Sequence, residues 1–125
     1  MNKNPLMVAG VFVAVIAAGL FFLNKPKNTP SPTPSKEIVV SGSEYSFNPA
    51  NITITKGEKI RLTFTNVGSQ FHNLIINGID VKTKTVATGK SDTIEFTASE
   101  SGSFTFFCEI GNHQSLGMEG ELKVE

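Results

Sequence analysis

One short stretch of this chain collects three side chains of the kinds that bind transition metals. Cys108, His113 and Met118 follow one another at intervals of five residues, and a second histidine, His72, lies upstream. A thiolate and two imidazoles in a plane, with a weak axial thioether, form the ligand set of an electron-transfer copper site. We therefore expect Cys108 to be the strong ligand, His72 and His113 to complete the plane, and Met118 to be the axial ligand.

Each of these residues also has an ordinary structural explanation when it is taken alone. A single buried cysteine is usually a small core hydrophobe, and a methionine often fills space in a core. The combination favours a metal site, because Cys108 is the only cysteine, His72 and His113 are the only histidines, and Met118 is the only methionine after residue 7. One cysteine is too few for a dinuclear purple copper centre, and no further histidines remain for a multicopper oxidase. The ligand inventory thus predicts a protein that passes single electrons and is not an enzyme.

Short β runs with turn signals between them fill the chain from residue 37 onward. Lys59–Asn66 alternates apolar and polar side chains, and Ser91–Thr97 does the same. This pattern predicts an all-β fold, an antiparallel Greek-key sandwich or barrel of seven to eight strands. The other expected strands are Glu37–Ser41, Tyr45–Phe47, Ile52–Thr55, Phe71–Ile76, Ser103–Cys108 and Met118–Glu125, with an edge strand or irregular segment at Ile79–Thr88.

These strands have to carry the ligands to one place. Side chains alternate across a strand with a period of two residues, so three of the ligands fall on rows that face the core. His113 lies in the loop that joins the last two strands, where Gly111 and Gly117 permit tight turns. The three inward rows are Phe104, Phe106 and Cys108; His72, Leu74 and Ile76; and Met118, Gly120, Leu122 and Val124.

A long apolar segment precedes the expected β domain. Leu6–Leu23 contains eighteen residues without a polar side chain, and a helix of that length spans about 27 Å, close to the ~30 Å of a hydrocarbon core. Residues 1–23 are therefore expected to form an N-terminal transmembrane helix that anchors the protein. The alternative is a signal peptide cleaved near Ala17-Ala18-Gly19. We favour the anchor, since cleavage there would leave the apolar run Leu20–Leu23 at the new N-terminus.

Residues 24–36 contain four prolines among serine, threonine and lysine, and this composition predicts an extended linker that reaches roughly 40 Å. The expected organisation is an anchor at 1–23, a linker at 24–36 and a β domain at 37–125. The β domain would face the periplasm or the cell exterior, and it would be secreted if the N-terminus were cleaved. Residues 37–125 carry seven basic and 11 acidic side chains. This negative charge, without a basic patch, argues against nucleic-acid binding.

Residues 37–125 resemble the cupredoxins, the plastocyanin- and azurin-like type 1 blue copper proteins. The resemblance implies that His72, Cys108, His113 and Met118 hold one copper ion, that Asn73 braces the site, and that electrons enter near an exposed edge of His113. It also implies a monomer that meets redox proteins such as cytochromes or oxidases transiently. The matching motifs are His72-Asn73, the run Ser103–Cys108, His113, Gly117-Met118-Glu119-Gly120, and the opening stretches Glu44–Pro49 and Ile52–Glu58.

Two features of the ligand loop depart from the family pattern. Four residues separate His113 from Cys108, which is more than in plastocyanin and like azurin, and another four separate it from Met118, slightly more than in azurin. Gly111-Asn112 stands where relatives often carry Pro-Gly. Loop length influences how strongly the methionine binds, so the sequence leaves the reduction potential open. Phe71, Phe106 and Phe107 are expected to keep the centre dry, and Ile110 and Leu116 are expected to form a small apolar docking patch around His113.

Three other functions compete with electron transfer. A protein that buffers or delivers copper would be favoured by open clusters of methionine and histidine, which the β domain lacks. Zinc can bind one cysteine and two histidines with an open position, but an inward Met118 argues against zinc. A sandwich used for adhesion without a metal would leave the coincidence of four ligands unexplained.

Overall fold

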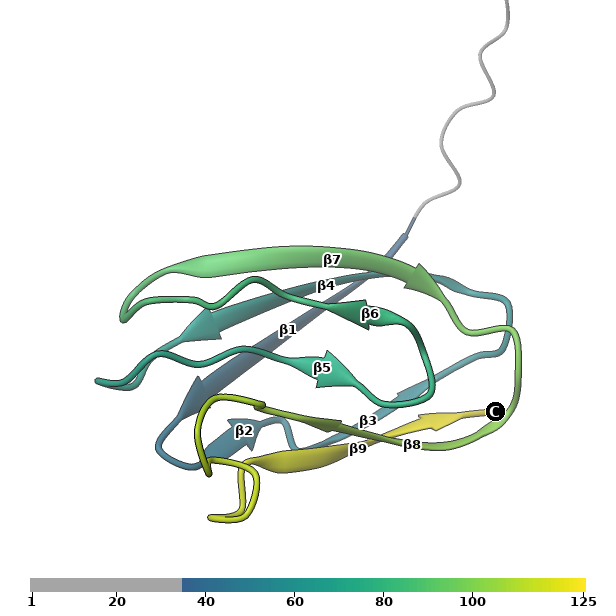
Figure 1. Ribbon diagram of the computed structural model, residues 1–125. Helices are drawn as coiled ribbons and strands as arrows, with labels where there is room; N and C mark the ends of the chain where they lie inside the picture. The colour runs from purple at the N-terminus through teal and green to yellow at the C-terminus, as the bar shows by residue number, and fades with distance from the viewer. Residues whose placement is uncertain (1–34) are drawn as a thin grey trace, which may run out of the picture. The chain divides into compact units, whose positions relative to one another are not determined.

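The computed structural model describes residues 35–125, which form two β-sheets that face each other (Figure 1). The expected anchor and nearly all of the expected linker lie outside the described residues. The part of the chain that the structure describes has no helix long and apolar enough to cross a membrane. The strands are β1 (Lys36–Ser43), β2 (Ser46–Asn48), β3 (Asn51–Ile54), β4 (Lys59–Asn66), β5 (Ile75–Ile76), β6 (Val81–Lys82), β7 (Ser91–Thr97), β8 (Gly102–Phe107) and β9 (Glu119–Val124).

The order of the strands confirms an all-β sandwich and corrects two details of the prediction. One sheet has the order β2-β1-β4-β7 and the other has the order β3-β9-β8-β5-β6. The expected antiparallel pairing holds for most neighbouring strands but not for all, because β1 pairs with β4 and β3 pairs with β9 in parallel. The described residues also form nine strands rather than seven or eight, since the short β5 and β6 pair as a hairpin at the edge of the second sheet.

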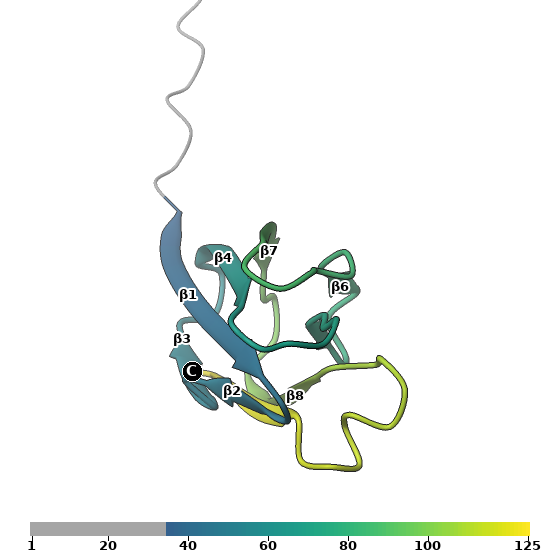
Figure 2. The same cartoon turned by 90° about the vertical axis from the view of Figure 1, so that its left-hand side faces the viewer.

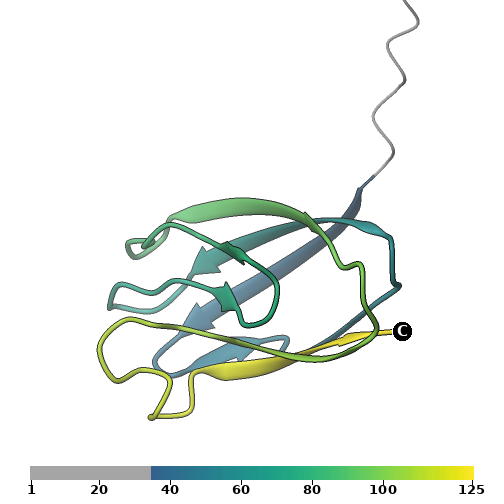
Figure 3. The ribbon, with the colours of Figure 1, turned by 45° about the vertical axis from the view of Figure 1, so that its right-hand side comes forward.

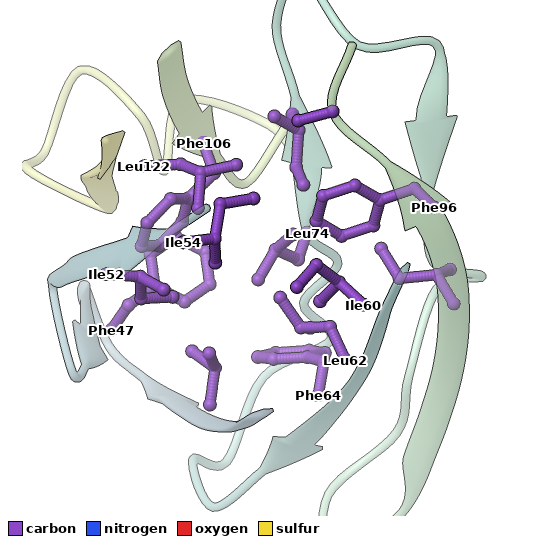
Figure 4. Packing of buried hydrophobic residues seen from close by; sticks show 14 of the residues in the cluster. Phe47, Ile52, Ile54, Ile60, Leu62, Phe64, Leu74, Phe96, Phe106 and Leu122 are labelled. Carbon is purple, nitrogen blue, oxygen red and sulfur yellow. The ribbon is translucent and has the colours of Figure 1, made fainter. Parts of the chain in front are cut away.

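The alternation that predicted β4 is visible in its burial. Ile60, Leu62 and Phe64 are at most 1% exposed, while the polar side chains between them face outward. Fully burying side chains of this size contributes roughly 1.5–3 kcal/mol each. Phe47 lies between the two sheets, and its ring packs edge-on against the rings of Phe64 and Phe106 (Figure 4). The distances between ring centroids are 5.9 Å to Phe64 and 5.2 Å to Phe106. The core therefore fixes both sheets relative to each other, and with them the strand ends that carry the metal ligands.

Several connections meet at one end of the sandwich. The long loop between β8 and β9 lies there, together with the turn after β1 and the segment that follows β4 (Figures 2 and 3). The described chain enters β1 at the opposite end, near the C-terminus (Figure 1). The segment expected as the strand Phe71–Ile76 is mostly irregular, and only a bridge between His72 and Val86 precedes β5. This segment brings the upstream histidine to the end where the long loop lies.

Candidate metal centre

Three of the four predicted ligands meet in a buried cluster. His72 and Cys108 are completely buried and His113 is 6% exposed. The Nδ1 atoms of the two histidines lie 3.1 Å apart, and the Cys108 Sγ lies 3.9 Å from Nδ1 of His72 and 3.5 Å from Nδ1 of His113. All three ligand atoms lie within 4.8 Å of one another, and this is the one such group among residues 35–125.

The hydrogen bonds on the far side of each ring establish which nitrogen is free to bind a metal. His72 donates from Nε2 to the Glu44 carboxylate at 2.9 Å, and His113 donates from Nε2 to the side-chain oxygen of Gln70 at 3.0 Å. A neutral imidazole carries one hydrogen, so both Nδ1 atoms hold lone pairs. The short approach of the two Nδ1 atoms is therefore not a hydrogen bond. Two lone pairs and a thiol sulfur converge on one point, an arrangement that a cation stabilises.

The spacing of the three atoms fits a transition metal between them. Bonds of about 2.0–2.1 Å to nitrogen and about 2.3 Å to sulfur, in a trigonal plane, place the nitrogens about 3.5 Å apart and the sulfur about 3.8 Å from each. The distances in the structure scatter around these values within a few tenths of an ångström. The donor set of His72, Cys108 and His113 thus fits a copper ion without rearrangement of the backbone.

Met118 is fully buried directly before β9, and its backbone is hydrogen bonded to the two other loop ligands. Its amide donates to the His113 carbonyl at 3.1 Å, and its carbonyl accepts from the Cys108 amide at 3.1 Å. A Cβ added at Gly42 would lie 3.1 Å from the Met118 methyl group and closer still to the Phe64 ring. The Met118 side chain therefore faces inward and packs against β1, as its place in the inward row predicted.

The loop between Cys108 and Met118 is closed by local hydrogen bonds. Gly111 and Gly117 have φ values of 50° and 108°, in the region that favours glycine. The His113 amide donates to the Ile110 carbonyl at 3.0 Å, which turns the chain so that the imidazole faces inward. The tight turns expected from the two glycines are present in the structure.

Asn73 connects the two segments that carry His72 and Cys108. Its amide group donates to the Glu109 carboxylate at 3.0 Å, and its side-chain oxygen accepts from the Glu109 backbone amide at 3.0 Å. Both residues are direct sequence neighbours of a ligand. The pair of hydrogen bonds therefore holds His72 and Cys108 at a fixed separation, which gives physical content to the bracing role expected for Asn73.

Sequence reasoning missed Glu44, which holds the far side of His72. The same carboxylate oxygen accepts hydrogen bonds from the backbone amides of Ser69 at 2.9 Å and Gln70 at 2.7 Å. These donors, the Gln70 amide foremost and then the His72 ring, lower the pKa of the Glu44 carboxyl to about 2. Glu44 belongs to a stretch that resembles the family, but a single acidic residue after a strand carries no local signal of this role.

The edge of His113 is covered, contrary to the expectation of an exposed edge. Gln70 accepts from its Nε2 and also donates to the Tyr45 hydroxyl at 3.1 Å. The Tyr45 ring lies 4.9 Å from the imidazole, centroid to centroid. Burial is the main cause that lowers the pKa of His113 below its ordinary value. Gln70 and Tyr45 together thus form a polar cap over the ring, and no motif of the sequence indicated this cap.

The expected apolar surroundings are present in part. Phe106 is 1% exposed and packs in the core against Phe47, whereas Phe107 is half-buried and lies beside β5 and β6. Phe71 is 60% exposed, so the expectation that its ring helps to bury the centre was wrong. Leu116 is 49% exposed, as a docking residue would be, whereas Ile110 packs partly against the core.

Comparison with known proteins agrees with the geometry of the site. The family model of the cupredoxin-like domain matches residues 12–124. A tobacco plastocyanin (Nicotiana tabacum) is 33% identical over 100 residues, which cover 69% of this chain and 97% of that protein. A copper-resistant cuproprotein, CopI of Rubrivivax gelatinosus, is 29% identical over 69% of this chain and 64% of that protein.

Solved structures show the same fold. Reduced auracyanin from the photosynthetic bacterium Roseiflexus castenholzii superimposes with a TM-score of 0.68 at 25% identity, and the match covers 74% of this chain and 99% of that structure. The matched family model, the plastocyanin relative and the two-sheet fold all indicate the same family, whose metal is copper. This chain belongs to the cupredoxin-like family, and its cofactor is one copper ion.

Proposed function

We propose that this protein is a mononuclear blue copper protein that carries single electrons between redox partners. His72, Cys108, His113 and Met118 hold the metal, with the roles expected from their chemistry. The observation that carries the proposal is the convergence of two Nδ1 lone pairs and one sulfur on a single buried point. The relatives support it, since plastocyanin and auracyanin are the proteins that the chain resembles.

Copper in such a site alternates between two oxidation states that differ by one electron. The protein's own contribution is to hold the ligands still. Both imidazoles are fixed from behind by Glu44 and Gln70, and the Asn73–Glu109 pair fixes the segments that carry them. A site that is already in place before the metal arrives has little to rearrange when the charge changes. The buried position of Cys108 leaves no room for a substrate at the sulfur, which favours a carrier over an enzyme.

The setting of this carrier is part of the proposal. We infer that the apolar segment Leu6–Leu23 attaches the protein to a membrane and that residues 37–125 work outside the cytoplasm as a monomer. The partners would be redox proteins such as cytochromes or oxidases, which bind transiently through small interfaces. Phe71 and Leu116 are exposed apolar side chains on two segments that carry ligands, and they are available for such contacts.

Copper delivery is the second candidate, and the similarity to a copper-resistant cuproprotein is the observation that favours it. Ligand exchange requires that an incoming group reach the metal. His72, Cys108 and Met118 are fully buried and His113 nearly so, which favours retention of the ion. Electron transfer is therefore the better-supported function. Transfer of Cu(I) to an acceptor protein within the mixing time would reverse this order.

The deciding experiment is the visible spectrum of the full chain after addition of Cu(II), beside the Cys108→Ser variant. A thiolate–copper bond gives an intense absorption in the orange-red, which ascorbate should bleach and a chemical oxidant should restore. The serine variant should bind copper without that band, because an alcohol oxygen cannot replace the thiolate. A wild-type protein without the band, or one that cannot be cycled, would refute the proposed function.

A further inference from the structure

The two ligand histidines are supported by acceptors of different charge. His72 donates to the carboxylate of Glu44, whereas His113 donates to the neutral amide of Gln70. Within residues 35–125, Glu44 is the only carboxylate hydrogen bonded to a ligand imidazole. It comes from the turn after β1 and reaches His72 across 28 positions of sequence. A charged group in this place affects the metal differently from the neutral amide on the other side.

The position of the Glu44 carboxylate is built by the segment that follows β4. The amides of Ser69 and Gln70 both donate to the same oxygen that His72 contacts. The backbone of Gly68 runs so close that a Cβ there would collide with the carboxylate. The side-chain oxygen of Asn66 accepts from the Gly68 amide at 2.9 Å and keeps this segment in place. The Glu44 carboxylate is thus held in one position by three hydrogen-bond donors, the Ser69 and Gln70 amides and the His72 ring.

A carboxylate that accepts from the far nitrogen of a metal-bound imidazole fixes the tautomer and the orientation of the ring and raises its basicity. Its negative charge also attracts a cation of higher charge more strongly than one of lower charge. Both effects favour Cu(II) over Cu(I) at Nδ1 of His72. Gln70 supplies His113 with the orienting hydrogen bond but without a full charge.

We propose that Glu44 is a positioning residue of the metal centre, which holds Nδ1 of His72 toward the metal and lowers the reduction potential through its carboxylate. This inference rests on the proposed function, because it assumes that the centre holds copper. In the redox step, Cu(II) gains one electron from a partner protein and becomes Cu(I), and no proton or bond is exchanged with Glu44.

Two substitutions separate the charge of Glu44 from its hydrogen bond. Glu44→Gln keeps an oxygen that can accept from His72 and removes the negative charge, whereas Glu44→Ala removes both. Glu95→Gln is the matched control, since it removes one negative charge from an exposed position on β7, where Glu95 pairs with Lys59 and Arg61. The reduction potential is measured by voltammetry on the full chain, and the Cu(II) dissociation constant is measured by competition with a chelator.

Glu44→Gln should raise the potential and Glu95→Gln should leave it near the wild-type value. A tenfold loss of Cu(II) affinity with unchanged Cu(I) affinity corresponds to about 59 mV for one electron. Glu44→Ala should weaken Cu(II) binding by about 10–100-fold, as substitutions of such supporting groups typically do. If Glu44→Gln and Glu95→Gln have the same potential, and Glu44→Ala binds Cu(II) as wild type does, Glu44 serves the fold alone and the inference is wrong.

Two further measurements keep the inference testable if Glu44→Ala does not fold or if copper does not bind. Gly68→Ala places a methyl group where the carboxylate lies and should shift the potential in the same direction as Glu44→Gln, with the carboxylate still present. Nitrogen-15 NMR of the metal-free full chain should show the hydrogen of His72 on Nε2 in the wild type and a mixture of tautomers in Glu44→Ala. A mixture already in the wild type would overturn the role of Glu44 independently of the copper proposal.

Discussion

At the scale of single residues, the hydrogen bonds behind the two histidines prepare the centre for a metal. Nε2 of His72 and Nε2 of His113 each have an acceptor, so both rings are in the tautomer that leaves Nδ1 free. Neither ring has to turn or change its tautomer when copper binds. The two side chains therefore lose their conformational entropy when the protein folds and not when copper binds. This makes the free energy of copper binding more favourable.

The axial ligand gives the first prediction. Met118→Leu keeps the volume of a buried side chain and should cost less than about 1.5 kcal/mol of stability. The variant should still show the orange-red band, because the three ligands of the plane remain. Its reduction potential should rise, since the lost sulfur donor had stabilised Cu(II). Voltammetry tests this, with Leu122→Met, further along the same inward row of β9, as the control that should leave the potential unchanged.

The second prediction concerns the acid stability of the metal-free protein. The pKa of the Glu44 carboxyl is lowered from 4.5 to about 2, so between these values the unfolded chain binds a proton that the folded protein does not. Stability from this group is fully present above pH 4.5 and is lost as the pH falls through about 2. Denaturant titrations from pH 5 to pH 2 should therefore show a smaller loss for Glu44→Gln than for the wild type. Parallel pH profiles would contradict the assignment.

Spacing and residue type predicted the side chains that the structure brings together, and the family resemblance added Asn73, but neither predicted the groups that hold the two imidazoles. Cys108, His113 and Met118 stand within eleven residues of one another and have few other uses in such a chain. Glu44 and Gln70 are common surface residue types, and their partners lie 28 and 43 positions away. Only the folded backbone brings them together, so no local pattern could have revealed the support of His72 or the cap over His113.

At the scale of elements, Asn66 organises the segment that leads from β4 to His72. It is completely buried at the end of the strand. Its amide group donates to the carbonyls of Gln70 at 2.7 Å and Val86 at 2.8 Å, and its oxygen accepts from Gly68. One side chain thus closes the turn that presents two backbone amides to Glu44, and it ties this turn to the strand partner of His72.

This arrangement gives the third prediction. Asn66→Ala leaves the Gln70 carbonyl and the Gly68 amide without their partner, while the Val86 carbonyl keeps the His72 amide as its donor. Each buried group left unpaired costs about 1–3 kcal/mol. We expect a clear fall in the free energy of unfolding, measured in denaturant, and weaker Cu(II) binding because His72 loses its fixed position. Thr65→Ala is the neighbouring control, since its hydroxyl bonds only Ser91 on the exposed face. Equal stability of the two variants would exclude this role for Asn66.

The boundaries of strands with regular alternation of apolar and polar residues were predicted correctly. The boundaries of irregular segments were not. β4 and β7 have the expected ends, because both alternate over their full length. The expected strand Phe71–Ile76 shortened to two residues, because its backbone pairing is interrupted after the bridge between His72 and Val86. The Leu74 amide donates to the hydroxyl of Thr83 instead of to a backbone carbonyl. Alternation also says nothing about which strand lies beside which, so the parallel pairs β1–β4 and β3–β9 could not be foreseen.

At the scale of the whole molecule, hydrogen bonds between protein groups hold the metal-binding side chains in place without a metal ion. The interactions that fix the ligands lie between protein groups, and the core beneath them joins both sheets (Figure 4). The fold should therefore survive when copper is withdrawn, in contrast to small domains that unfold without their metal.

Copper removal gives the fourth prediction. Reduction followed by a Cu(I) chelator should leave the far-ultraviolet circular dichroism unchanged and lower the melting temperature. A ligand present at 100 times its dissociation constant stabilises the folded state by about 2.7 kcal/mol. The gap in melting temperature between the copper-loaded and metal-free forms should shrink in Cys108→Ser, which binds copper more weakly. Loss of the β-sheet signal on removal would show that the metal holds the fold together.

β1 begins at Lys36, at the end of the sandwich opposite the loop between β8 and β9, and its eight residues run to the turn that contains Glu44 (Figure 1). At about 3.3 Å per residue, this strand covers roughly 26 Å. If the protein is tethered to an electrode through a residue ahead of Lys36, the copper lies at the end of the domain away from the electrode. The direct current between the electrode and the copper should therefore be small. A soluble mediator that reaches the free end should restore the current, and a tether moved to that end should make the mediator unnecessary.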